Sequence, residues 1–191
     1  MNCCQTSVDT ENADKGAFFM RMWFKIIICT ILLMTVVGET QAQQVRYVKV
    51  TGSDTANGLT VSTAFRTIQR AITSVTTPGT TIYVGPGTYS EQVSITAATR
   101  AGSAGNPNTI IGDITGTHTG STAGPVILDG GTTRSYCLYV TGSDNWFFDS
   151  ITIQRARSYD VYMGLSAANT TFGFDRCTIV VPPNASSFGI Y

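Results

Sequence analysis

Charged residues are scarce in this chain of 191 residues, and lysine is scarce above all. Asp, Glu, Lys and Arg make up 13% of the sequence, about half of the ~25% found in average globular chains. The formal net charge is zero, and lysine occurs only at positions 15, 25 and 49. Because nucleic acid is bound through clustered lysine and arginine, we expect no nucleic-acid partner.

Metal-binding side chains are scarce as well. The chain has one histidine, His118, and after residue 42 only two cysteines, Cys137 and Cys177. No Cys-x-x-Cys motif or His/Cys cluster indicates a metal site. We expect Cys177 to be a small core residue and Cys137 to point outward, so that they form no disulfide. His118 lies in a Gly/Thr/Ser-rich stretch and is predicted to be a loop residue without a catalytic partner.

Long apolar runs are limited to one stretch of 12 residues, Ile26 to Val37. Arg21 and Lys25 precede it, and Thr40-Gln-Ala42 follows as a small-x-small site. A membrane span needs about 20 apolar residues, so a permanent anchor is the weaker interpretation. The pattern predicts a signal peptide over residues 20–42, cleaved after Ala42.

This assignment divides the chain. Residues 1–19 are polar and precede the signal awkwardly, which suggests a mis-assigned start and translation from Met20 or Met22. Residues 43–191 remain as one domain, large enough for a real core. We expect a monomer that is secreted or held at the cell surface.

A segment of this domain occurs twice, 26 residues apart. Four residues return in the second copy: Phe148, Asp149, Thr152 and Ile153 become Phe174, Asp175, Thr178 and Ile179. Short strand patterns repeated at this spacing are typical of a solenoid, in which each coil buries its apolar face against the next. The repeat therefore predicts an all-β coiled architecture.

Carboxylates at the turns of this repeat allow two interpretations. Asp149 and Asp175 would stack as possible ligands for calcium, which takes 6 to 8 oxygens. Aspartate at a tight turn also commonly bonds its own backbone, and this structural role is favoured. Asp129 and Asp54 are interpreted as turn residues in the same way.

A single segment after the signal has helical periodicity. Residues 63–75 place apolar side chains at helical spacing, and Ser62 or Thr63 is suited to cap the start. An amphipathic helix laid across the first coil of a solenoid would cover its exposed core and strand edges. We therefore expect an N-terminal capping helix near residues 63–75.

Four motifs carry a resemblance to a known family. They are Tyr47-Val-Lys-Val-Thr-Gly-Ser-Asp54, Ala64-Phe-Arg-Thr-Ile-Gln-Arg-Ala-Ile72, Pro78-Gly-Thr-Thr-Ile-Tyr-Val84 and Gly87-Thr-Tyr89. They resemble the N-terminal module of secreted right-handed parallel β-helix proteins of the pectate-lyase-like superfamily, and the resemblance covers nearly all of residues 45–191. It implies a fold and leaves the reaction open.

The resemblance also implies how the coils are built. First strands would be residues 136–140 and 159–163, second strands 146–148 and 172–174, and third strands 151–153 and 177–179. Strand alternation then points eight apolar residues inward: Leu138, Val140, Trp146, Phe148, Ile151, Ile153, Val161 and Met163. Tyr139 and Tyr162 would face solvent, one above the other.

In lyases that the chain resembles, a groove along the first strands holds an acidic polysaccharide. By that resemblance, Arg155 and Arg157 would hold a uronate carboxylate, Asp160 would face the groove, and Tyr139 and Tyr162 would offer flat faces to sugar rings. The alternative is solvated loop arginines and an ordinary tyrosine ladder. No catalytic residue or metal ligand can be assigned residue by residue.

Two functions follow from the resemblance. The first is a secreted protein that acts on extracellular polysaccharide, as a lyase performing β-elimination on a uronate polymer. The alternative is a non-catalytic carbohydrate-binding or adhesin-like solenoid; hydrolysis ranks last because it needs paired acids in the groove. No cofactor is evident, although calcium is possible in a full-length enzyme.

Because the chain stops inside what looks like another first strand, we expect a C-terminal truncation that omits the catalytic coils.

Overall fold

The computed structural model describes residues 43–99, 101–164 and 171–180. The predicted signal peptide at 20–42, the polar extension at 1–19 and the C-terminal residues 181–191 lie outside the described residues. Among the described residues, no helix is long and apolar enough to cross a membrane.

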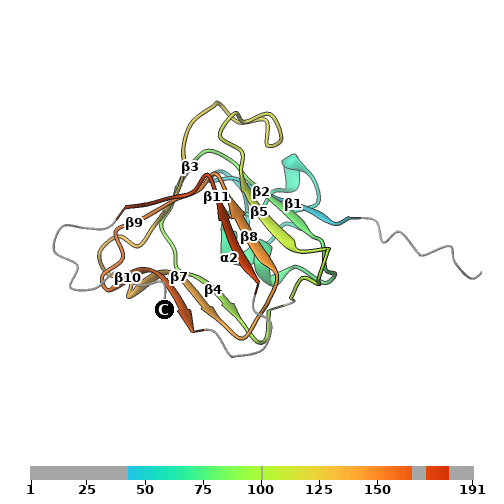
Figure 1. Ribbon diagram of the computed structural model, residues 1–191. Helices are drawn as coiled ribbons and strands as arrows, with labels where there is room; N and C mark the ends of the chain where they lie inside the picture. Colours follow the sequence, from blue (N-terminus) through green and yellow to red (C-terminus); the bar gives the residue numbers. More distant parts are fainter. Residues whose placement is uncertain (1–42, 100, 165–170, 181–191) are drawn as a thin grey trace, which may run out of the picture. The chain divides into compact units, whose positions relative to one another are not determined.

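Three parallel sheets form the walls of the fold (Figure 1). One sheet has the order β1 (Val45–Val48), β2 (Thr81–Val84), β5 (Asn108–Gly112), β8 (Trp146–Asp149) and β11 (Phe172–Asp175). The second has the order β4 (Val93–Thr96), β7 (Tyr136–Thr141) and β10 (Tyr159–Gly164). The third has the order β3 (Gly87–Tyr89), β6 (Val126–Asp129), β9 (Thr152–Gln154) and β12 (Thr178–Val180).

The chain visits the sheets in rotation, so that each set of three strands makes one coil of a parallel β-helix. From β4 the chain passes to β5 in the first sheet and β6 in the third, and then returns to β7 beside β4. The next coil is β7, β8 and β9, and the one after it is β10, β11 and β12. The predicted fold class is confirmed.

The 26-residue repeat stacks in register, as predicted. Phe148 pairs with Phe174 in neighbouring strands of one sheet, and Ile153 pairs with Ile179 in another. The rings of Phe148 and Phe174 lie 5.3 Å apart between centroids. Each apolar side chain stacks on its copy in the next coil, and these stacks form a continuous core. Such a core needs contacts only between neighbouring coils.

The core holds all eight side chains that strand alternation pointed inward. Each is at most 4% exposed. The largest fully buried side chain is Trp146 on β8. Cys177 packs against this core from the last described coil, as predicted, and both Cys137 and Cys177 are free thiols.

The N-terminal helix is shorter than predicted. The α-helix α2 covers only Ile68–Thr73, and a separate 3₁₀ turn, η1, covers Val61–Thr63. Between them Phe65 forms a β-bridge with Val48, which takes it out of the helix. The predicted caps at Ser62 and Thr63 are therefore wrong, and Thr67 is the N-cap of α2.

Two carboxylates from other parts of the chain determine where α2 begins. Asp54 accepts hydrogen bonds from the backbone N–H of Thr67 at 3.0 Å and from its hydroxyl at 3.0 Å. Glu91 accepts from the N–H groups of Ile68 at 2.8 Å and Gln69 at 3.0 Å. Because the first N–H groups of a helix lack partners within it, the helix starts where these carboxylates reach.

The helix also covers a sheet edge, as a cap of the first coil should. The side-chain amide of Gln69 accepts from the N–H of Ser94 at 2.6 Å and donates to the carbonyl of Ser94 at 3.2 Å. Ser94 lies on β4, the edge strand of its sheet among the described strands. A single side chain thus supplies the two bonds that a further strand would make.

Replacing Gln69 by alanine should lower the free energy of unfolding by about 1–3 kcal/mol, because it leaves the N–H and the carbonyl of Ser94 without these partners. Gln69→Glu should retain the acceptor and lose the donor, and therefore fall between the wild type and alanine. Urea unfolding followed by circular dichroism measures the change. Thr73→Ala, at an exposed position of the same helix, is the control, and an equal loss there would contradict the edge-capping role.

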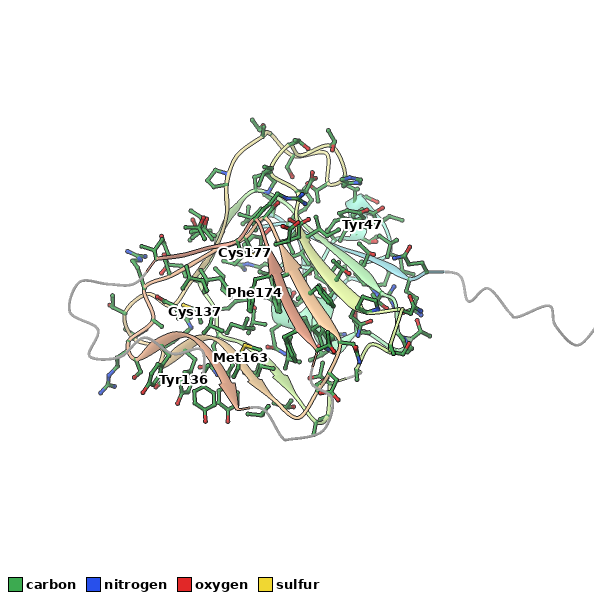
Figure 2. All side chains as sticks on the ribbon, in the orientation of Figure 1. Tyr47, Tyr136, Cys137, Met163, Phe174 and Cys177 are labelled. Carbon is green, nitrogen blue, oxygen red and sulfur yellow. The ribbon has the colours of Figure 1, made fainter. Side chains whose placement is uncertain are left out.

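Cys137 does not point outward as predicted. Its side chain is 0% exposed, and its thiol lies 3.0 Å from the carbonyl of Gln154. Figure 2 shows Cys137 between the strands, at the corner where β9 turns into β10. At such a corner both sides of a strand are covered, so strict alternation does not hold there, and burial raises the pKa of the Cys137 thiol to about 12.

Candidate functional site

Four tyrosines gather on the outer face of the second sheet and form the tyrosine cluster: Tyr136 and Tyr139 from β7, and Tyr159 and Tyr162 from β10. Tyr139 and Tyr162 are stacked with 5.2 Å between centroids and 9° between planes. Tyr136 lies 5.1 Å from each of them. All four are half-buried, and Figure 2 shows Tyr136 projecting away from the core. The predicted stacking of Tyr139 on Tyr162 is confirmed.

Sequence reasoning missed the other half of the cluster. Tyr136 and Tyr159 are three residues before Tyr139 and Tyr162, an odd spacing that alternation assigns to the opposite face. Both strands, however, have two consecutive buried residues, Cys137 with Leu138 and Asp160 with Val161. These double positions reverse the alternation and bring all four rings to one face.

Asp160 is buried in this structure, whereas the prediction had it facing the groove. It is only 8% exposed, and its Oδ1 accepts a hydrogen bond from the N–H of Ala156 at 2.7 Å. The thiol of Cys137 lies 3.4 Å from the same oxygen. Asp160 therefore holds the turn between β9 and β10.

Arg155 and Arg157 do not act together as a carboxylate clamp in this structure. The guanidinium of Arg155 binds Asp129, one coil away, with Nε at 2.9 Å from Oδ1 and Nη2 at 2.5 Å from Oδ2. Arg157 is exposed, and its backbone N–H donates to the carbonyl of Arg134 at 2.7 Å. The alternative interpretation, loop arginines beside a tyrosine ladder, describes Arg157, whereas Arg155 has a structural partner.

The pair formed by Asp129 and Arg155 stabilises an unusual turn. Arg155 has a φ of 60°, a left-handed conformation that non-glycine residues adopt at a cost. Burial acts to raise the pKa of Asp129, but hydrogen bonds from Arg155, Gly131 and Gln154 outweigh it and leave the pKa below its ordinary value. The ion pair with the ionised carboxylate of Asp129 therefore offsets the cost of the left-handed backbone of Arg155.

A similar pair of aspartate and arginine lies at the turns that follow β8 and β11 of the first sheet. Asp149 forms an ion pair with Arg176, which has a φ of 49°. Ser150, at the position of the first copy that corresponds to Arg176, has a φ of 56°. The carboxylate of Asp175 also lies 3.4 Å from Arg176. Asp149 and Asp175 thus both pair with Arg176 at these turns. The described residues contain no group of three or more His, Cys, Asp or Glu side chains suited to a metal ion.

A second aromatic stack lies on the outer face of the first sheet. Tyr47 and Tyr83 are stacked with centroids 6.0 Å apart, and His118 lies 4.1 Å from Tyr83 with 6° between the rings. The loop of His118 is held by Asp113, whose Oδ2 accepts from the N–H groups of His118 at 2.9 Å and Thr119 at 2.7 Å. The predicted loop position of His118 is correct, but its stacking and the role of Asp113 were not foreseen.

An open hollow of about 810 Å³ lies between α2 and β4. Ser94 and Thr96 of β4, Gln69 and Thr73 of α2, and Gly142 after β7 belong to its lining. The lining residues that the structure describes carry hydroxyl, amide and small apolar groups and no charge. Chemically, the β4–β7–β10 face therefore combines flat aromatic rings with neutral hydrogen-bonding groups.

Comparison with solved structures supports the fold. A family described as "Protein of unknown function (DUF1565)" matches residues 50–127. A search of curated proteins found no match. Among solved structures, the crystal structure of pectate lyase Pel9A is similar, with a TM-score of 0.51 and 22% sequence identity over 74% of this chain. The match covers 35% of the length of that enzyme. This chain therefore has a pectate-lyase-like parallel β-helix fold.

Proposed function

We propose that the chain binds extracellular polysaccharide through the tyrosine cluster on the β4–β7–β10 face. The observation that carries this proposal is the stack of Tyr139 on Tyr162, flanked by Tyr136 and Tyr159, on the outer side of a sheet. Tyrosine combines a large apolar ring with a hydroxyl, and four half-buried rings have no core to fill on that side. Solenoids use such extended faces, built by equivalent positions of successive coils, as binding surfaces.

The binding interpretation is better supported than catalysis by the described residues. Two of the charged groups proposed for a uronate site already have partners in the fold: Arg155 binds Asp129, and Asp160 accepts from the N–H of Ala156. The rings and hydroxyl groups that remain are suited to hold sugar units. We therefore place carbohydrate binding first and a surface or adhesin-like role with it.

A polysaccharide lyase is the second candidate, favoured by the likeness to pectate lyase Pel9A. In this proposal Arg157, which is exposed and lies two residues before Tyr159, would neutralise a uronate carboxylate, and calcium would serve a longer enzyme. Incubation of the full-length protein with calcium and a panel of uronate polymers tests it. Absence of unsaturated product absorbing in the ultraviolet would sink the lyase candidate and leave binding intact.

Secretion is part of the same proposal. A protein that binds extracellular polysaccharide must be exported, and residues 20–42 have the pattern of a signal peptide. N-terminal sequencing of the protein recovered from the medium should begin near Gln43. A start far from that residue would contradict the proposed cleavage site.

Replacing Tyr139 and Tyr162 together by alanine should weaken polysaccharide binding by about tenfold for each ring lost. Affinity electrophoresis or a glycan array with the full chain measures the effect. The matched control is Tyr47→Ala with Tyr83→Ala, a stacked tyrosine pair on the outer face of a different sheet. Equal losses in both double variants would place the binding site elsewhere.

A further inference from the structure

The stacked pair of Tyr139 and Tyr162, here called the tyrosine ladder, is not continued by a third ring on β4. Tyr139 pairs in register with Tyr162 on one side and with Ser94 on the other. The ring of Tyr162 covers one face of Tyr139. In the position where the ladder would continue, Ser94 has only a hydroxymethyl side chain, too short to cover the second face.

The position without a third ring, Ser94, borders the hollow beside α2. Ser94 and Thr96 belong both to the outer side of β4 and to the lining of the hollow. A volume of about 810 Å³ lies within the range of about 300–1,000 Å³ of small-molecule sites. Ser94 therefore connects the hollow with the tyrosine cluster, because it lines the hollow and pairs in register with Tyr139.

The residues around this surface that the structure describes are neutral hydrogen-bonding partners. Ser94 receives a hydrogen bond from the side-chain amide of Gln92 at 3.1 Å, and Thr96 and Thr73 contribute hydroxyl groups. The amide of Gln69 is already bonded to the backbone of Ser94 on both of its sides. Hydroxyl groups that both donate and accept are matched to the hydroxyl groups of an uncharged sugar.

The helix limits how far a ligand can extend. α2 lies across the N-terminal end of the coils, with Ile68, Ala71 and Ile72 buried in the core (Figure 1). A chain that follows the tyrosine ladder along the coils towards β4 meets this helix at the far wall of the hollow. The site is therefore closed at one end.

We propose that this surface is a subsite for the end of a neutral glycan, with one sugar ring stacked on the free face of Tyr139 above Ser94 and the terminal unit in the hollow beside α2. This inference rests on the proposed polysaccharide binding. It adds two statements, that the ligand is uncharged and that a chain end is recognised.

Ser94→Tyr tests the subsite directly, because the new ring would continue the ladder and occupy the place of the sugar. Binding of neutral glucan, mannan and xylan oligosaccharides and of polygalacturonate to the full chain is measured by calorimetry. Ser94→Tyr should weaken binding of the preferred neutral glycan by about tenfold or more.

Thr96→Tyr is a second variant that fills the hollow from the neighbouring outward position. Thr152→Tyr, an added ring on the outer side of β9, should have no effect.

The outcomes separate this inference from the proposal on which it rests. Two results together support the subsite. Ser94→Tyr and Thr96→Tyr both lose affinity for the neutral glycan, and an oligosaccharide and its polymer compete equally when compared at the same concentration of chain ends. Tighter binding of polygalacturonate than of every neutral glycan overturns the uncharged ligand, and glycan binding that both variants retain overturns the subsite. In both cases polysaccharide binding itself stands. Absence of binding to every glycan overturns both proposals.

Discussion

Replacing Trp146 by alanine should lower the free energy of unfolding by about 3–5 kcal/mol, the range found when a large aromatic side chain is removed from a core. The indole is 0% exposed and lies on β8, paired in register with Asn108 on one side and Phe172 on the other. Its Nε1 also donates to the hydroxyl of Ser143 at 3.3 Å. Alanine would leave a cavity that the neighbouring coils cannot fill, because each is fixed by its own ladder hydrogen bonds.

Urea unfolding followed by circular dichroism measures this loss. The matched control is Phe147→Ala, the next residue of the same strand. Phe147 is half-buried on the outer side, with its ring against Gly173, and its removal opens no cavity in the core. A loss for Trp146→Ala no larger than that for Phe147→Ala would contradict the assignment of Trp146 as a centre of the core.

The inward position of Trp146 could be predicted because it depends on local information. Alternation along a strand and a 26-residue repeat both act between neighbours, in the sequence or in the next coil. Phe148 above Phe174 and Tyr139 above Tyr162 follow from the same two rules. In a solenoid each coil contacts little beyond its neighbours, so local rules extend unusually far.

The same rules failed where a side chain reaches past its own repeat unit. α2 begins at Ile68 because Glu91, some twenty residues further on, accepts from its first N–H groups. Arg155 is bound by Asp129 of the preceding coil, and no periodicity identifies that pair. Corners fail for another reason, since burial on both sides removes the distinction between inner and outer face, as at Cys137 and Asp160.

The candidate site contains residues that the local rules predicted and residues that they did not. The stacked pair Tyr139 and Tyr162 was predicted because it belongs to the ladder, whereas Tyr136 and Tyr159 depend on the reversed alternation at the corner. In the charged part of the predicted site, Asp160 and Arg155 have partners that the sequence did not reveal, and both groups hold turns of the fold. A spacing in sequence shows that a group is near, but it does not show which partner already binds it.

Replacing Asp113 by alanine should lower the free energy of unfolding by about 3 kcal/mol, because several buried donors lose one acceptor at once. Asp113 is 3% exposed, and its Oδ2 accepts from the N–H groups of His118 and Thr119 and from the Thr119 hydroxyl at 2.9 Å. His118 is the only histidine, so its ring gives a single pair of proton signals in an NMR spectrum. In Asp113→Ala these signals should move towards random-coil positions, since the ring would leave Tyr83. Unchanged His118 signals would contradict the role of Asp113.

The acid sensitivity of the fold follows from the same carboxylate. Burial acts to raise the pKa of Asp113, but hydrogen bonds from Thr119, Thr115 and His118 outweigh it and leave the pKa below its ordinary value. The stabilisation is therefore present above the unfolded-state pKa of about 3.9 and is lost as the pH falls through the folded-state value. Glu91 acts in the opposite sense, because burial raises its pKa and protonation favours the folded state as the pH falls.

Asp113→Asn separates charge from hydrogen bonding in this loop. Its carbonyl can take the place of Oδ2, and its amide can donate to the hydroxyl of Thr115, which now donates to Oδ1 at 3.2 Å. The asparagine variant should therefore keep the His118 signals near their wild-type positions. Its free energy of unfolding should lack the part of the pH dependence that comes from titration of Asp113. Stability curves for wild type, Asp113→Ala and Asp113→Asn between neutral pH and acid should converge as the pH falls, because protonation removes from the wild type what the variants already lack. Parallel curves would contradict the lowered pKa, because they would show that the ionised and the protonated carboxyl group stabilise the loop equally.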